Sequence, residues 1–171
     1  HLGWEVFEGE SPDGPFNRSA AVNDAVRRAG RRDVYVIADA DVVIDPAQAS
    51  AAVVQAADTG RLVMPFTEYA ALSEEFTARV LADRYAGNWR PGIGIRMSTH
   101  VSSVLAVPAA LWARSGGFDE RFVGWGWDDL AFHAACSKVE KPIRLPGTVW
   151  HLWHPTAPEN TKGGADYRCS P

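Results

Sequence analysis

Apolar and polar residues follow one another in blocks that predict strands and helices by turns along the chain. The apolar, β-branched run 34–38 is typical of a strand buried on both faces. Helical spacing of small apolar residues predicts a helix that begins near Asn17 or Ser19 and ends before Gly30. The same patterns predict further strands at 1–9, 61–66, 101–107, 143–145 and 148–152, and further helices at 46–57, 73–81, 108–114 and 130–139.

Strands that alternate with helices indicate an α/β domain with a mainly parallel sheet flanked by helices. No internal repeat, low-complexity tract or linker interrupts the chain, so residues 1–171 are interpreted as one domain. The segment 85–96 is rich in glycine, asparagine and proline, which predicts a surface loop of the kind that often carries recognition.

Composition and charge exclude several classes of protein. With 171 residues, 46% hydrophobic and 22% charged, the chain can bury a sizeable core and is not disordered. The formal net charge of −4 leaves no basic footprint, so general nucleic-acid binding is not expected. No stretch of the sequence reaches membrane-spanning length, and its first residues do not have the pattern of a signal peptide, so neither a membrane span nor a signal peptide is expected. Only two cysteines occur, Cys136 and Cys169, which favours a reduced, cytoplasmic compartment.

Two carboxylates follow the run 34–38 directly, in the sequence Asp39-Ala40-Asp41. In extended backbone they would point to opposite faces, so they converge on one cation only if the chain turns at Ala40. Carboxylate oxygens suit Mg²⁺ or Mn²⁺, and ligands of open α/β sheets bind beyond the carboxyl ends of the strands. The alternative is that both aspartates simply end a strand and cap a turn.

A second pair of carboxylates, Asp128 and Asp129, stands at the predicted start of a helix, just after Trp125-Gly126-Trp127. The helix dipole favours the ionised form of a carboxylate there, and an ionised carboxylate can act as a general base toward a hydroxyl group. Aspartate is also a preferred helix cap, so Asp128 could cap the helix while Asp129 lies in its first turn.

Two histidines occur three residues apart in the sequence His151-Leu152-Trp153-His154-Pro155. Neutral imidazole is a common metal ligand, although a histidine near a strand end is more often a hydrogen-bonded structural group. If the segment stays extended, the two rings face opposite sides, so only one is expected to reach a metal.

These motifs together resemble the catalytic domain of metal-dependent GT-A glycosyltransferases. The similarity is greatest to the β-1,4-galactosyltransferases and to related bacterial and phage family 2 enzymes, and it spans roughly residues 16–155. The motifs that carry it occur in the same order, and they are Phe16-Asn17-Arg18-Ser19, Asn23, Asp39-Ala40-Asp41, Gly116-Gly117-Phe118-Asp119, Trp125-Gly126-Trp127-Asp128-Asp129 and His154.

The resemblance implies a role for each matching position on the donor side. Phe16 and Arg18 would contact the nucleotide, and Asp39 would bind the ribose or reach the metal through water. Trp125 would lie near the donor and acceptor sugars, on a loop that closes.

The resemblance also implies a metal site. Asp41 would ligate Mn²⁺ or Mg²⁺ that bridges the diphosphate of the donor. His154 would be the third protein ligand, with His151 as the competing choice and Asp39 as an alternative carboxylate.

On the acceptor side, the family usually has Trp-Gly-Gly-Glu-Asp where this chain has Trp-Gly-Trp-Asp-Asp. Asp128 then stands at the position that usually binds the acceptor, and Asp129 at that of the catalytic base. Asp128 is one methylene shorter than glutamate and Trp127 replaces a glycine. Retaining relatives carry asparagine where this chain has Asp129, so inversion is expected.

The expected function is therefore metal-dependent transfer of a sugar, with inversion, from a nucleotide diphosphate sugar to an acceptor hydroxyl of unknown class. Uridine diphosphate sugars are the family's usual donors. Such domains normally begin with a strand and helix that hold the base, so the sequence is interpreted as N-terminally incomplete. Two alternatives stay open, namely a metal-dependent phosphoester hydrolase acting on nucleotide sugars and a non-catalytic module that binds sugar or nucleotide.

Overall fold

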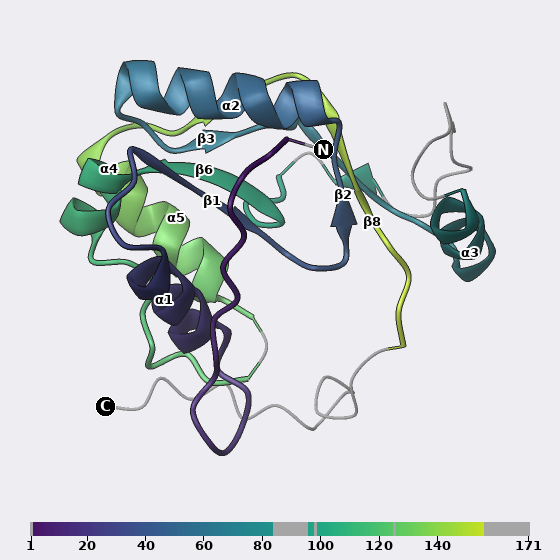
Figure 1. Cartoon of the computed structure of the whole chain (residues 1–171), viewed down its shortest axis with the longest axis horizontal. Helices are drawn as coiled ribbons and strands as arrows, with labels where there is room; N and C mark the ends of the chain where they lie inside the picture. The colour runs from purple at the N-terminus through teal and green to yellow at the C-terminus, as the bar shows by residue number, and fades with distance from the viewer. Residues whose placement is uncertain (1, 84–95, 98, 125, 156–171) are drawn as a thin grey trace.

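The computed structural model describes residues 2–83, 96–97, 99–124 and 126–155. Within them lie five helices and eight strands, distributed as Figure 1 shows. The helices are α1 (Arg18–Ala29), α2 (Pro46–Thr59), α3 (Glu74–Ala82), α4 (Ala109–Ser115) and α5 (Asp128–Val139). The strands are β1 (Val34–Ala38), β2 (Val42–Val43), β3 (Val63–Met64), β4 (Glu68–Ala71), β5 (Arg96–Met97), β6 (Val104–Pro108), β7 (Ile143–Arg144) and β8 (Thr148–His151).

The strands form two four-stranded sheets, ordered β1-β6-β3-β7 and β2-β8-β4-β5. In the first sheet β1 pairs with β6 along its whole length, from Val34 opposite Pro108 to Ala38 opposite Val104. In the second sheet β8 lies between β2 and β4. Because β2 follows β1 closely in the chain, this pairing places β8 near the end of β1.

The expectation of an α/β chain is confirmed at the level of mixed helices and strands, but the expectation of a mainly parallel sheet is wrong. Only the β3–β7 and β4–β8 pairings are parallel, and the other four described pairings are antiparallel. The reason is that β6 runs against both of its neighbours, β1 and β3. Alternation of strands and helices along a sequence does not reveal such a reversed strand.

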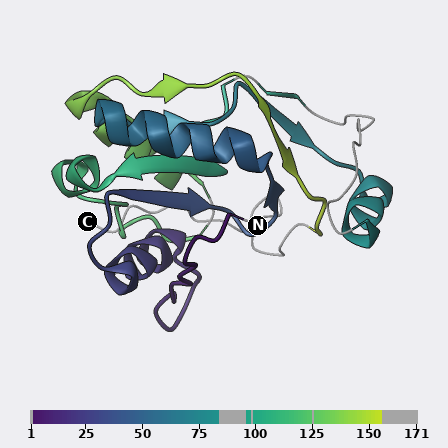
Figure 2. The same cartoon turned by 45° about the horizontal axis from the view of Figure 1, so that its top comes forward.

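The core lies on both faces of the first sheet. Strand β6 is buried throughout, and its side chains alternate between faces. Leu105 and Val107 belong to the cluster that α4 and α5 cover, whereas Ala106 packs with Ala52 and Ala56 of α2. Figure 2 shows α2 lying along the sheet, with α1 below β1.

Most predicted helices are confirmed, because their caps are explicit in the sequence. The side chains of Asn17, Asp45 and Ser73 each accept a hydrogen bond from a backbone N–H in the first turn of the helix that follows. Gly30 and Gly60 end α1 and α2 with positive φ angles, which glycine adopts without strain.

The predicted strand at 1–9 is wrong for its described residues, 2–9, which form no strand. This segment runs beside α1 and is held by ion pairs of Glu5 with Arg32 and of Glu10 with Arg28. The apolar side chain of Val6 is 82% exposed, so alternation of apolar residues alone did not produce a paired strand. The predicted loop 85–96 lies almost wholly outside the described residues.

No helix in the described part of the chain is long and apolar enough to cross a membrane.

Aromatic packing anchors α5 in the core, which makes a clear stability test. Phe132 is 1% exposed and stacks on Phe118 with ring centroids 4.2 Å apart. We expect Phe132→Ala to lower the free energy of unfolding by about 3–5 kcal/mol, because it removes a buried ring and leaves a cavity. Denaturant unfolding measures this. The matched control, Leu130→Ala on the exposed side of the same helix, should cost less than about 1 kcal/mol, and equal losses would contradict the packing described.

Candidate functional site

The end of β1 and the start of β2 carry the first pair of aspartates. The backbone N–H of Asp39 donates to the carbonyl of Ser103, 2.9 Å away, and the chain then turns at Ala40 and Asp41. The backbone N–H of Leu152 donates to the Asp41 carbonyl at 2.7 Å. The turn at Ala40 that convergence of the two carboxylates requires is therefore present, and it sets Asp41 against the end of β8.

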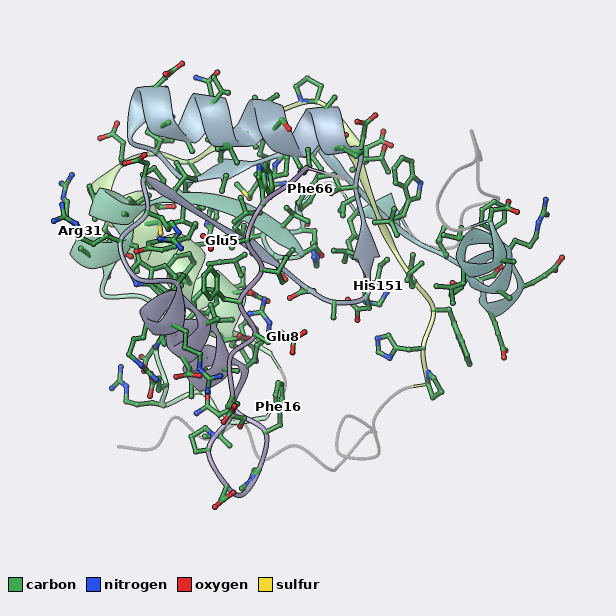
Figure 3. The ribbon with its side chains drawn as sticks, in the orientation of Figure 1. Glu5, Glu8, Phe16, Arg31, Phe66 and His151 are labelled. Atoms are coloured by element: carbon green, nitrogen blue, oxygen red, sulfur yellow. The ribbon has the colours of Figure 1, made fainter. Side chains whose placement is uncertain are left out.

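Asp41 lies beside both histidines. Its Oδ2 atom is 3.2 Å from Nε2 of His151 and 3.2 Å from Nε2 of His154. One ligand atom from each of the three residues lies within 4.8 Å of the others, so together they could hold a metal ion. Figure 3 shows His151 beside β2. The expectation that only one ring would reach this place assumed an extended segment, but β8 ends at His151 and both rings lie beside Asp41.

The electrostatics of this triad favour a charged carboxylate. A hydrogen bond from His151 holds the pKa of Asp41 below its usual range, and the same contact raises the pKa of His151. The Oδ1 atom of Asp41 is buried and has no hydrogen-bond partner among the described residues. A buried carboxylate oxygen without a partner is unfavourable unless something binds it, so the donor set fits a divalent cation.

The second pair of aspartates meets the first through Arg18. Its guanidinium lies over the ring of Phe118 and contacts three carboxylates. Nη2 is 2.7 Å from Asp39, and Nη1 is 2.7 Å from Asp129 and 2.9 Å from Asp128. One arginine thus joins the end of β1 to the start of α5.

Asp129 is an unusual carboxyl group. Burial raises its pKa to about 6, and the neighbouring carboxylates Asp128 and Asp39 act in the same direction against the opposing effect of Arg18. The main physical cause is burial, which disfavours the charged form of the carboxyl group, and the two neighbouring carboxylates add to this effect. A pKa near the working pH is what a general base needs.

The start of α5 differs from the capping alternative. Trp127, not Asp128, occupies the cap position, with a φ angle of 69° that is rare for a residue other than glycine. Asp128 and Asp129 are the first two residues of the helix and make no cap. Their carboxylates are therefore free to contact Arg18, and Trp127 itself is 60% exposed.

The turn before α5 is held by two asparagines of the α1 region. Asn17 donates to the carbonyl of Glu120, while Asn23 donates to the carbonyl of Phe118 and accepts from its N–H. The N–H of Gly124 donates to the carbonyl of Phe16. These bonds fix the approach to Asp128 and Asp129.

The described contacts do not test the roles predicted for Phe16 and Trp125 on the donor side. Phe16 is 60% exposed, just before α1 (Figure 3), so its ring is available to a ligand. Trp125 lies outside the described residues. Both remain predictions.

Sequence patterns did not reveal the role of two serines, Ser102 and Ser103, that lie just before β6 and close to Asp39. Ser102 is buried, its hydroxyl lies 3.4 Å from Oδ2 of Asp39, and a hydrogen bond from it lowers the pKa of Asp129. Ser103 has a φ angle of 72°, and its hydroxyl lies 2.8 Å from Nε2 of His100. A serine pair before a strand carries no distinctive signal, so only the pairing of β6 with β1 reveals it.

The two groups of residues share one electrostatic neighbourhood. The charge of Asp39 raises the pKa of both Asp129 and His151, so the base side and the metal side lie near the same carboxylate. A cavity of about 530 Å³ elsewhere is lined by Asn23, residues 115–121 and part of α5, and by none of the site aspartates or histidines. The side chains of Asp41 and His154 are 37% and 53% exposed, so the metal side is accessible from solvent.

No protein-family model matches the chain, and no curated protein matches it.

Proposed function

We propose that this chain is a metal-dependent, inverting glycosyltransferase that moves a sugar from a nucleotide diphosphate sugar to an acceptor hydroxyl. The observation that carries the proposal is the convergence of Asp41, His151 and His154. Asp39, two residues before Asp41, pairs with Arg18, and Arg18 also pairs with Asp129. A cation site and a carboxyl group of raised pKa in one neighbourhood are what this reaction requires.

Asp41, His151 and His154 would hold the cation. A set of two imidazoles and one carboxylate favours Mn²⁺ over Mg²⁺, because Mg²⁺ prefers oxygen ligands and water. When bound, such an ion supplies Lewis-acid stabilisation of charge on a departing diphosphate. The fit is supported by the buried Asp41 oxygen that has no hydrogen-bond partner among the described residues.

Asp129 would be the general base. Its Oδ atoms would accept the proton of the acceptor hydroxyl as that oxygen attacks the anomeric carbon and the bond from that carbon to the diphosphate breaks. With a pKa of about 6 the carboxyl group is mostly ionised at pH 7 and can still accept a proton. Asp128 beside it would contact the acceptor, and Phe16 the nucleotide.

The test is consumption of uridine diphosphate sugars with and without Mn²⁺, across a panel of acceptors that includes sugars, peptides and lipids. Sugar transfer that requires both Mn²⁺ and an acceptor supports the proposal. Turnover with water alone would favour a phosphoester hydrolase, and nucleotide binding without turnover would favour a non-catalytic module. Either result overturns the transferase.

A further inference from the structure

The guanidinium of Arg18 is the most heavily used polar group of the candidate site. Nε and Nη2 both donate to Oδ1 of Asp39, at 3.2 and 2.7 Å. Nη1 donates to Asp128 at 2.9 Å and to Asp129 at 2.7 Å. An arginine has five N–H donors, and four of them are used by these contacts.

The position of Arg18 makes this arrangement specific. It is the first residue of α1, directly after the cap Asn17, so the helix start fixes where its side chain leaves the backbone. The Phe118 ring lies 5.4 Å from the guanidinium carbon. The side chain of Arg18 is only 22% exposed, and those of Asp39, Asp128 and Asp129 are 26%, 8% and 23% exposed. Ion pairs that solvent and salt screen this little contribute more than exposed surface pairs.

The charges in the cluster do not balance. Three carboxylates face one cation, and burial of one carboxylate without that cation would be strongly unfavourable. Arg18 is therefore required for Asp39 and Asp129 to lie close together in their ionised forms.

We propose that Arg18 is a positioning residue that ties the end of β1, which leads to the metal side, to the start of α5, which carries the base, and that it is not a direct ligand of the donor phosphates. The inference rests on the proposed function for its catalytic consequence. The resemblance implies that Arg18 contacts the nucleotide, whereas four of its five N–H donors already contact carboxylates, which leaves only one for a phosphate.

The catalytic part of the test compares Arg18→Ala and Arg18→Lys with wild type. The two readouts are the affinity for uridine diphosphate with Mn²⁺, by calorimetry, and turnover with a saturating donor. We expect turnover to fall by at least about 100-fold in both variants, since misplacing a catalytic group by about 1 Å costs that much. Nucleotide affinity should change less than about threefold, within roughly one RT of binding free energy. Lysine should not restore turnover, because a point charge cannot replace the fork that contacts three carboxylates.

The matched control is Arg27→Ala, on the exposed side of α1, which should change neither readout. A loss of nucleotide affinity above about tenfold with turnover at saturation preserved would overturn the proposal.

The structural part of the test does not need activity, so it separates this inference from the proposed function. Tm is measured at pH 8 for wild type and for the single variants Asp129→Asn, Arg18→Lys and Arg18→Ala. It is also measured for the two double variants that combine Asp129→Asn with each Arg18 substitution. Without the arginine fork, Asp129 becomes a buried carboxylate with weaker or no compensation. We therefore expect Asp129→Asn to raise Tm by several degrees more in the Arg18 variants than in wild type, on the scale of about 2–4 °C per kcal/mol for a chain of this size. An equal change in Tm on Asp129→Asn with and without Arg18 would overturn the proposed positioning role of Arg18. If wild type transfers no sugar but the changes in Tm differ, the proposed transferase function is wrong and the positioning role of Arg18 is supported.

Discussion

Replacing Asp129 with asparagine should lower turnover by about 10²–10⁴-fold, the range that a positioned general base contributes. The affinity for uridine diphosphate with Mn²⁺ should stay within a few-fold of wild type, because the amide preserves shape and the metal side is untouched. Steady-state kinetics and calorimetry measure the two effects. The matched control is Asp58→Asn on the exposed surface of α2, which should leave both unchanged. A near-normal rate for Asp129→Asn would show that the base is another group.

The same variant should become more stable at neutral pH. The pKa of Asp129 is raised to about 6, above the ordinary value of 3.8, so the folded state favours its protonated form. The stability that this preference contributes is fully present below pH 4 and is lost as pH rises through about 6. The amide of Asp129→Asn cannot ionise, so above pH 7 the variant should gain about 1–3 kcal/mol of unfolding free energy. Wild-type turnover should show the opposite trend and rise through pH 6, as the base loses its proton. A variant that is less stable than wild type at pH 8 would contradict the assigned cause of the shift.

Replacing Asp41 with alanine should abolish the dependence of nucleotide binding on Mn²⁺. Asp41 contributes the carboxylate of the triad, and even loss of an outer partner of a metal ligand costs about 10–100-fold in metal affinity, so loss of this ligand should cost at least about 100-fold. Calorimetric titration of uridine diphosphate with and without Mn²⁺ measures the effect, with Asp58→Ala as the surface control. Unchanged affinity in both conditions would mean that the cation binds elsewhere.

The same titration distinguishes the two histidines. His151 and His154 lie at equal distances from Asp41, so His151→Ala and His154→Ala should each weaken Mn²⁺-dependent binding. If one variant binds as wild type does, that histidine serves only as a hydrogen-bond partner of Asp41.

The helices could be predicted from sequence because their ends have local causes. Asn17, Asp45 and Ser73 cap α1, α2 and α3 by contacts within a single turn. Strand direction has no local cause, which is why the antiparallel placement of β6 between β1 and β3 was not predicted. The short strands β2 and β4 were missed because each depends on β8, a partner far along the chain.

The candidate residues could be selected from the sequence, but their contacts could not. Asp39, Asp41, Asp129 and the histidines were selected by residue type and spacing. The sequence did not reveal that β8 would end at His151 and allow both rings to reach Asp41, since that depends on where a strand stops. Nor did it reveal that Arg18 would face three carboxylates, because its partners come from β1 and α5 and lie 21 to 111 positions away.

The most direct test of the account is a crystal of the protein grown with Mn²⁺ and uridine diphosphate, with the metal located by its anomalous scattering. We expect one manganese peak among Asp41, His151 and His154, with the diphosphate bound to the same ion. A manganese ion bound away from these side chains, or a nucleotide on another face of the molecule, would contradict the claim that this triad and Asp129 serve one reaction.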